Sequence, residues 1–270
     1  MNFLIGLEFE FGWKVSSTNY YFYKNETFLN IKQELEKTFG RNWTSNIQEF
    51  TQDGSLQFKT KKESYYGIEL ITKPMKESIA IKFCKDMLKW MQNNEKVCTN
   101  KTCGLHVNIS ILNKKNKKNQ LNIDYYNLLS ITPQKELLQL FGREQNKYCQ
   151  ISENKKFSLI INNKETNKNN LKYWLKYLKN STIKVNSKNH NEELISVNNK
   201  KEFFKLIKKS YLDRLSQIPK RISIVEKVNN EEKYYEFRII GNSNYEYRYK
   251  DIIKCINIFK ESIKKSIQNK

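Results

Sequence analysis

The sequence predicts an α+β fold in which antiparallel strands form a sheet and helices pack on its apolar face. Two kinds of pattern predict it. Several runs alternate apolar and polar residues, as half-buried strands do, and others repeat apolar residues with the helical period. No internal repeat and no linker-like stretch divides the 270 residues, so one mixed domain is the simplest interpretation.

The first predicted strand covers residues 2–12. Successive side chains of a strand point to opposite faces, so Glu8 and Glu10 share one face. The opposite face is apolar and consists of Phe3, Ile5, Leu7, Phe9 and Phe11. Because like charges on one face repel each other unless a cation lies between them, this pair is the first candidate for a site.

A helix is predicted next, over residues 26–39, and Gly40 ends it. Its apolar stripe consists of Phe28, Ile31, Leu35 and Phe39. Asp53-Gly54-Ser55 is a turn signal that leads into Leu56–Lys59, and Tyr65–Thr72 is predicted to be a strand that ends before Pro74.

The rest of the chain continues to mix both patterns. In order, we predict a helix over 77–93, a strand over 104–112, a basic loop at 113–119, helices over 124–130, 134–141, 171–179 and 200–213, paired strands over 221–228 and 233–240, and a helix over 250–267. The apolar side of the 77–93 helix consists of Ile79, Phe83, Met87, Trp90 and Met91. The polar segment 180–199 is predicted to be irregular, and the region 124–215 is inserted between strands of the candidate site.

Composition limits the classes of function. The formal charge of +21 favours polyanionic partners such as nucleic acid, although dispersed Lys, Asn and Ile are also what an AT-rich coding sequence produces. No apolar run reaches the length of about 20 residues that crosses a bilayer, so no membrane association is expected. Five cysteines without framework spacing favour a reducing, cytoplasmic location.

Four of the predicted strands carry unusual polar residues on the face opposite their apolar residues. These residues are Glu8 and Glu10, Glu69, His106 and Asn108, and Glu236 and Arg238. If the strands are neighbours, the carboxylates converge and need cations; carboxylate oxygens with one imidazole suit Mg²⁺ or Mn²⁺. An arginine beside them favours a phosphate ligand, so the set is typical of phosphoryl transfer. Alternatively, Glu236 and Arg238 form a structural ion pair and Asp53 belongs to an ordinary turn.

These segments resemble, in the same order, the amidoligase family of carboxylate–amine ligases, which share the catalytic fold of glutamine synthetase. The matching segments are Gly6-Leu7-Glu8-Phe9-Glu10-Phe11, Asp53-Gly54-Ser55-Leu56, Gly67-Ile68-Glu69-Leu70-Ile71-Thr72-Lys73-Pro74, Cys103-Gly104-Leu105-His106-Val107-Asn108, Gly142-Arg143 and Glu236-Phe237-Arg238-Ile239-Ile240-Gly241. The resemblance implies one catalytic domain over residues 1–270, with a curved antiparallel sheet, the acidic site on its concave face and helices on the other face.

The resemblance also implies roles for individual residues. It implies a phosphate clamp for Arg238, an amine-binding role for Asp53, and phosphate or carboxylate binding for Arg143 and Arg221. Asn108 stands where the family commonly has a second histidine; an amide can hydrogen-bond a nucleotide but carries no charge. The implied metal ligands are Glu8, Glu10, Glu69, His106 and Glu236.

The implied reaction joins a carboxylate donor to an amine acceptor, each a small molecule, a peptide or a protein. ATP phosphorylates the carboxylate with the help of two divalent ions, and the amine attacks the acyl phosphate to give an amide. Two alternatives remain open. One is a binding module of the same fold that uses its basic surface on nucleic acid or another polyanion. The other is a metal-dependent nucleotide or phosphoester hydrolase.

Overall fold

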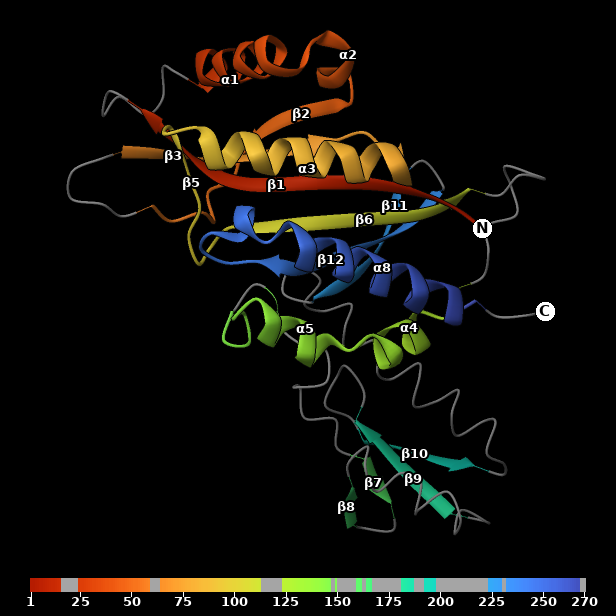
Figure 1. The fold of residues 1–270 in the computed structure, drawn as a ribbon. Helices are drawn as coiled ribbons and strands as arrows, with labels where there is room; N and C mark the ends of the chain where they lie inside the picture. Colours follow the sequence, from red (N-terminus) through yellow and green to blue (C-terminus); the bar gives the residue numbers. More distant parts are fainter. Residues whose placement is uncertain are drawn as a thin grey trace. The chain divides into compact units, whose positions relative to one another are not determined.

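The computed structural model describes residues 1–15, 24–58, 64–112, 123–146, 149, 223–229 and 232–267, together with four short strands between residues 159 and 197. These residues belong to two units. The first comprises Met1–Cys149 and Ser223–Lys270, and the second comprises Gln150–Ile222. The first unit holds the described candidate residues, and Figure 1 shows its sheet and helices.

One antiparallel sheet runs through the first unit. Its main path is β11 (Ile224–Asn229), β12 (Glu232–Gly241), β6 (Gly104–Leu112), β1 (Asn2–Val15), β3 (Ser64–Thr72) and β2 (Ile47–Gln52). Two short strands, β4 (Met75–Lys76) and β5 (Val97–Cys98), also pair with β1. All of these pairings are antiparallel, which confirms the predicted sheet type.

The first strand has the predicted alternation. Its apolar residues Phe3, Ile5, Leu7, Phe9 and Phe11 are at most 5% exposed. The strand is longer than predicted, because it continues to Val15 and pairs with β3 as far as Ser64. Such a long central strand is paired on both sides along much of its length, so it fixes the positions of Glu8 and Glu10 firmly.

Helices cover the apolar face of this sheet. They are α1 (Lys24–Phe39), α3 (Glu77–Asn93) and α8 (Tyr249–Lys265), and the short α2 (Arg41–Thr44) follows α1. Aromatic contacts attach each of the three to a strand. Phe28 of α1 stacks on Phe50 of β2 at 5.9 Å between ring centroids. Phe83 of α3 contacts Phe9 at 6.3 Å, and Phe259 of α8 stacks on Phe237 at 4.1 Å. Burying such rings stabilises the unit and leaves the opposite face of the sheet for polar groups.

Two further helices are α4 (Tyr125–Ile131), which packs against α8, and α5 (Gln134–Leu140), which packs against β12. Asp124 caps α4 by accepting a hydrogen bond from the Asn127 backbone N–H at 3.1 Å. Tyr125 donates its hydroxyl to the Ile224 carbonyl at 2.7 Å. These contacts hold the strand that leads into the site. The 3₁₀ helix η3 (Tyr245–Tyr247) connects β12 to α8.

The second unit contains a four-stranded antiparallel sheet. Its order is β10 (Glu192–Val197), β9 (Ser181–Asn186), β7 (Leu159–Ile161) and β8 (Lys164–Thr166). The prediction that 180–199 is irregular is therefore wrong. Residues 181–186 alternate polar residues with Ile183 and Val185, a strand pattern that the polar composition of the segment hid. The helices predicted at 171–179 and 200–213 and the loop at 113–119 lie outside the described residues.

The structure differs from the predictions in two other places. The strand β2 was not predicted, because its edge position leaves Ile47 and Phe50 only half-buried and weakens the alternation. Ile79 was expected inside but is 46% exposed. It lies in the first turn of α3, at the margin of a buried stripe that includes Ala80, Cys84 and Met87. In the part of the chain that the structure describes, no helix combines the length and apolar character needed to cross a membrane.

Candidate functional site

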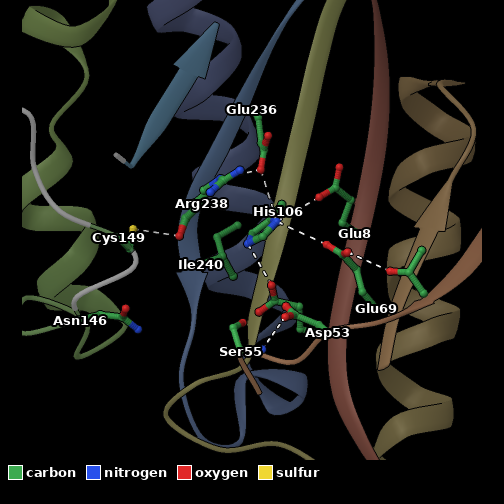
Figure 2. Close-up of polar contacts among 12 residues, drawn as sticks. Glu8, Asp53, Ser55, Glu69, His106, Asn146, Cys149, Glu236, Arg238 and Ile240 are labelled. Carbon is green, nitrogen blue, oxygen red and sulfur yellow. Dashed lines mark hydrogen bonds and ion pairs between the residues drawn. The ribbon is translucent and has the colours of Figure 1, made fainter. Parts of the chain in front are cut away.

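The polar face of the sheet gathers the candidate residues from four neighbouring strands. The pairing register places Glu8 opposite His106, Glu10 opposite Glu69, and Glu236 opposite Asn108. Side chains directly opposite each other on one face lie about 5 Å apart at Cβ, so the register alone brings these groups into contact. Figure 2 shows Glu8, Glu69 and Glu236 directed toward His106.

His106 lies at the centre of this cluster, and both of its ring nitrogens face carboxylates. Nδ1 lies 3.0 Å from Glu8 Oε2, 3.4 Å from Glu236 Oε1 and 3.8 Å from Glu69 Oε1. Nε2 lies 3.3 Å from Glu10 Oε1. The imidazole side chain is 12% exposed, so these interactions are poorly screened by water. A histidine that faces carboxylates at both nitrogens is favoured in its protonated form.

The pKa values of His106 and Glu8 move apart, as expected for an ion pair. Burial would lower the pKa of His106, but the charges of Glu10, Glu236 and Glu8 outweigh it and raise the pKa to about 9. Burial also disfavours the charged form of Glu8 and would by itself raise its pKa. Hydrogen bonds from His106 and Asn108, with the charges of His106 and Lys227, lower it to about 2. In the metal-free protein His106 therefore serves as the cation that holds the acids together.

The other two acids of β1 and β3 lack enough positive charge. Burial, with the nearby charge of Glu8, raises the pKa of Glu69 to about 7. Burial is also the main reason that the pKa of Glu10 is raised, although the charges of His106 and Arg143 oppose it. Because Glu10 and Glu69 are opposite each other in the register, their mutual repulsion adds to this effect. A divalent cation would remove the repulsion.

Glu236 is the most deeply buried acid of the cluster and has cations on both oxygens. Its side chain is 0% exposed. Arg238 Nε donates to Oε1 at 2.6 Å, and the Lys227 ammonium is in contact with Oε2. The attraction of Glu236 raises the pKa of both cations against the opposing effect of burial. Positive charge therefore collects on β11 and β12, while the remaining carboxylates lie on β1 and β3.

Two overlapping groups have donor atoms close enough to hold a metal ion. One consists of Glu8, His106 and Glu236, and the other of Glu10, Glu69 and His106; within each, the ligand atoms lie within 4.8 Å of one another. Carboxylates with one imidazole suit Mg²⁺ or Mn²⁺. A neutral imidazole has a single lone pair, so His106 completes one group at a time. A second ion on this face would need further oxygen ligands.

Three polar residues support the acids. Asn108 donates its amide to Glu8 Oε1 at 2.6 Å, while its own Oδ1 is buried and has no hydrogen-bond partner among the described residues. Thr51 of β2 donates to Glu69 Oε2 at 3.2 Å. Asp53 begins the predicted turn and accepts the Ser55 backbone N–H at 2.7 Å. Its charge helps to raise the pKa of Glu10, and Figure 2 shows it on the other side of His106 from Arg238 and Glu236.

Arg143 lies next to the cluster, at the end where β6 and β12 meet. It is 4% exposed, and its Nη1 donates to the Ile240 carbonyl. Two glycines make room for the guanidinium, because a Cβ on Gly104 would lie 2.9 Å from Nη1 and a Cβ on Gly241 would lie 1.9 Å from it. Beside it, the pairing of β12 with β6 shifts between Phe237 and Ile240. Arg143 thus holds in place the irregular stretch of β12 that follows Arg238.

Two residues of this face were not predicted from the sequence, and one predicted site residue lies outside the described residues. Lys227 is within a predicted strand, and the alternation of that strand already places it on the face of Val225, which pairs with Glu236. Thr51 could not have been found, because its strand was not predicted. Arg221 lies outside the described residues.

Comparisons with known proteins add no assignment to this geometry. The chain matches no model of a known protein family, and a search of curated proteins finds no match.

Proposed function

We propose that the chain is an ATP-dependent carboxylate–amine ligase that works with divalent metal ions, Mg²⁺ or Mn²⁺. One observation carries the proposal: four buried or half-buried carboxylates from three strands surround His106, and Arg238 donates to the same Glu236 oxygen that faces the imidazole. Acids that hold metals beside an arginine are the parts that phosphoryl transfer needs. The order of motifs that resembles the amidoligase family favours amide formation over other phosphoryl transfers.

The residues fit divalent ions. A protonated imidazole now occupies the centre of the acids, which is the place where positive charge is needed. The buried Oδ1 of Asn108, without a hydrogen-bond partner among the described residues, offers one more neutral oxygen on the same face. Mg²⁺ commonly binds one or two carboxylates and completes its shell with water and substrate phosphates. The second ion can therefore take ligands from the nucleotide.

In this proposal the two ends of the site have different tasks. Glu8, Glu10, Glu69, Glu236 and His106 would hold the metal ions, which supply positive charge to the phosphates and to the carboxylate donor. Arg238 would neutralise charge on the transferring phosphoryl group. The donor carboxylate oxygen attacks the γ-phosphorus of ATP, and ADP leaves. The amine nitrogen then attacks the acyl carbon, phosphate leaves, and the nitrogen loses a proton.

Asp53 is the residue that we assign to the amine. Its charge acts on Glu10, and Figure 2 shows it on the opposite side of His106 from Arg238. A carboxylate attracts an ammonium group and accepts its hydrogen bonds, so it would orient the amine toward the acyl phosphate. Arg143 is buried, and its Nη1 donates to a backbone carbonyl, so we assign it to positioning β12 and not to binding phosphate.

Hydroxylamine gives a test that needs no knowledge of the natural amine. The protein is incubated with Mg²⁺, ATP, hydroxylamine and a panel of carboxylic acids that includes acidic peptides. A ligase releases ADP and forms a hydroxamate in equal amounts with the correct acid, because hydroxylamine intercepts the acyl phosphate. ADP release that is independent of any acid, without hydroxamate, would instead identify a hydrolase.

Matched variants attribute that activity to the site. Glu236→Gln and Glu8→Gln remove a carboxylate from one metal group with little change in shape, and both should abolish hydroxamate formation. Glu226→Gln is the control, because Glu226 is a half-buried carboxylate on neighbouring β11 that pairs with Lys233 outside the cluster. If Glu236→Gln and Glu8→Gln retain full activity, the acids on this face are not the site.

A further inference from the structure

Lys227 neutralises Glu236, yet it remains partly exposed to solvent at the edge of the cluster. Its ammonium contacts Glu236 Oε2, while Arg238 holds the other oxygen at 2.6 Å. The carboxylate is fully buried, but the Lys227 side chain is 33% exposed, so the lysine reaches it from the solvent side. Tyr234, its partner in the register, lies beneath it with the ammonium 6.0 Å from the ring centroid.

The strand order separates the charges across the face. Lys227 is on β11 and Arg238 on β12, at one edge of the sheet. His106 follows on β6, and the carboxylates of β1 and β3 lie beyond it. A ligand that spans this face therefore meets Lys227 and Arg238 beside Glu236 at one end and the other three candidate metal-binding acids toward the other. A nucleotide phosphate chain with its bound metals has the complementary arrangement of charge.

Metal binding would change what Lys227 contacts. The group of Glu8, His106 and Glu236 uses a carboxylate that is already neutralised by cations, because Glu236 Oε1 faces His106 and Arg238 and Oε2 contacts Lys227. A divalent ion there repels the ammonium and takes over the neutralisation of the carboxylate. Lysine has a flexible stem and donors without fixed geometry, so it can turn toward a ligand on the solvent side. The planar guanidinium of Arg238 remains beside it and can share the same anion.

We propose that Lys227 and Arg238 form an anion-binding subsite for the phosphate chain of a nucleotide, and that Lys227 exchanges Glu236 for phosphate when a divalent ion binds. This rests on the proposed function and adds a residue and a substrate contact to it. Two adjacent cations beside metal ions suit a multiply charged phosphate chain better than a single carboxylate, which one arginine could bind.

The exchange predicts effects of opposite sign in one variant. In Lys227→Met, which keeps the length of the stem but removes the charge, Mn²⁺ alone should bind several-fold more tightly, because a competing cation has left Glu236. The same variant should bind tripolyphosphate and ATP, each with Mn²⁺, roughly 10- to 100-fold more weakly, the usual effect of losing a charge-assisted contact. Isothermal titration calorimetry measures all three affinities.

Two further variants complete the experiment. Lys227→Arg keeps the charge and should restore phosphate binding to within a few-fold of the unaltered protein. Lys233→Met is the control, since Lys233 pairs with Glu226 at 3.4 Å and strand alternation places it on the other face of the β11–β12 hairpin. It should leave all three affinities unchanged.

The outcomes separate this inference from the proposed function. If the unaltered protein binds both phosphate probes but Lys227→Met binds them equally well, or binds Mn²⁺ more weakly, the subsite is wrong and the ligase proposal is untouched. If the unaltered protein binds tripolyphosphate but not ATP, the polyphosphate site stands, but its assignment to a nucleotide and the ATP-dependent function both fall. Binding of neither probe overturns both.

Discussion

Glu8 of β1 and His106 of β6 are direct partners in the sheet register, and His106 Nδ1 lies 3.0 Å from Glu8 Oε2. The pair connects the two halves of the acid cluster, since the same imidazole also faces Glu10 through its other nitrogen at 3.3 Å. In the metal-free protein this histidine is a cation shared by acids that would otherwise repel one another. In a metal-bound protein it has to become a neutral ligand. Most of the testable behaviour of the site depends on that change.

Replacing the histidine should separate its two roles. We expect His106→Gln to weaken Mn²⁺ binding by more than about 100-fold, because even partners of metal ligands contribute about 10- to 100-fold. Without metal at pH 7, the variant should also lose about 3 kcal/mol of folding stability, since removing one partner leaves buried charges unpaired. Calorimetry with Mn²⁺ and chemical denaturation measure the two effects. An unchanged Mn²⁺ affinity would exclude His106 as a ligand.

The number of bound ions should depend on the nucleotide. Because both candidate groups share His106, we expect one Mn²⁺ per chain in the protein alone. A non-hydrolysable ATP analogue supplies phosphate oxygens, and the number should then rise to two. Electron paramagnetic resonance counts free Mn²⁺ during each titration. Two tightly bound ions without nucleotide would show that the groups act independently of the shared imidazole.

Metal affinity should increase with pH in a defined range. The pKa of His106 is about 9 and that of Glu69 about 7, so protons compete with the ion at both residues. The apparent Mn²⁺ affinity should rise steeply up to pH 7, less steeply from pH 7 to 9, and level off above that. In Glu69→Gln the steeper part below pH 7 should disappear. A pH-independent affinity would contradict the protonated state of the cluster.

The stability of the metal-free protein should change in the opposite direction. The folded-state pKa of His106, about 9, exceeds its reference value of 6.5, so its contribution is fully present below pH 6.5 and is lost as the pH rises through 9. The raised pKa of Glu69 acts in the same sense between its reference value of 4.5 and about 7. Denaturation at pH 6 and pH 9 should show a loss of about 4 kcal/mol at the higher pH, about 3 kcal/mol of it from His106. The slope above pH 7 should be absent in His106→Gln.

The glycine slot around Arg143 gives a stability test with an internal control. Gly241→Ala places a Cβ 1.9 Å from Arg143 Nη1 and 2.5 Å from the Cys103 carbonyl, at a φ of +152°. We expect a loss of about 3 kcal/mol or more. Gly54→Ala is the control, because a Cβ there meets nothing within 4 Å, and it should change the unfolding free energy by less than about 0.5 kcal/mol. Equal effects would show that Arg143 readily finds another position.

The faces of the site strands could be predicted from sequence because a period of two depends only on neighbouring residues. Glu8 and Glu10 were separated from Phe9 by that rule alone. The register could not be predicted in the same way, because the pairing of Glu10 with Glu69 joins residues that are far apart in the chain. Lys227 was overlooked for this reason. It becomes part of the site only once Val225 is known to face Glu236.

The secondary-structure predictions that failed concern segments whose apolar and polar residues alternate only weakly. The polar stretch around Ser181–Asn186 forms a strand although its composition suggested none. The edge strand Ile47–Gln52 went unnoticed because half-buried residues replace a clear apolar side. Thr51, which supports Glu69, was missed with it. Resemblance to a family did not depend on these segments, so the candidate acids could still be named.

The order of the strands in the chain has a consequence for protein synthesis. Glu8, Glu69 and His106 leave the ribosome early, whereas Glu236 and Arg238 are on β12, which pairs with the free side of β6. A nascent chain that ends before residue 236 lacks the most buried acid and the guanidinium beside it. Such a chain carries the other acids but lacks the guanidinium proposed to bind the phosphate. In the proposed enzyme, activity therefore begins only when the last strand of the sheet is in place, so unfinished chains would not consume nucleotide.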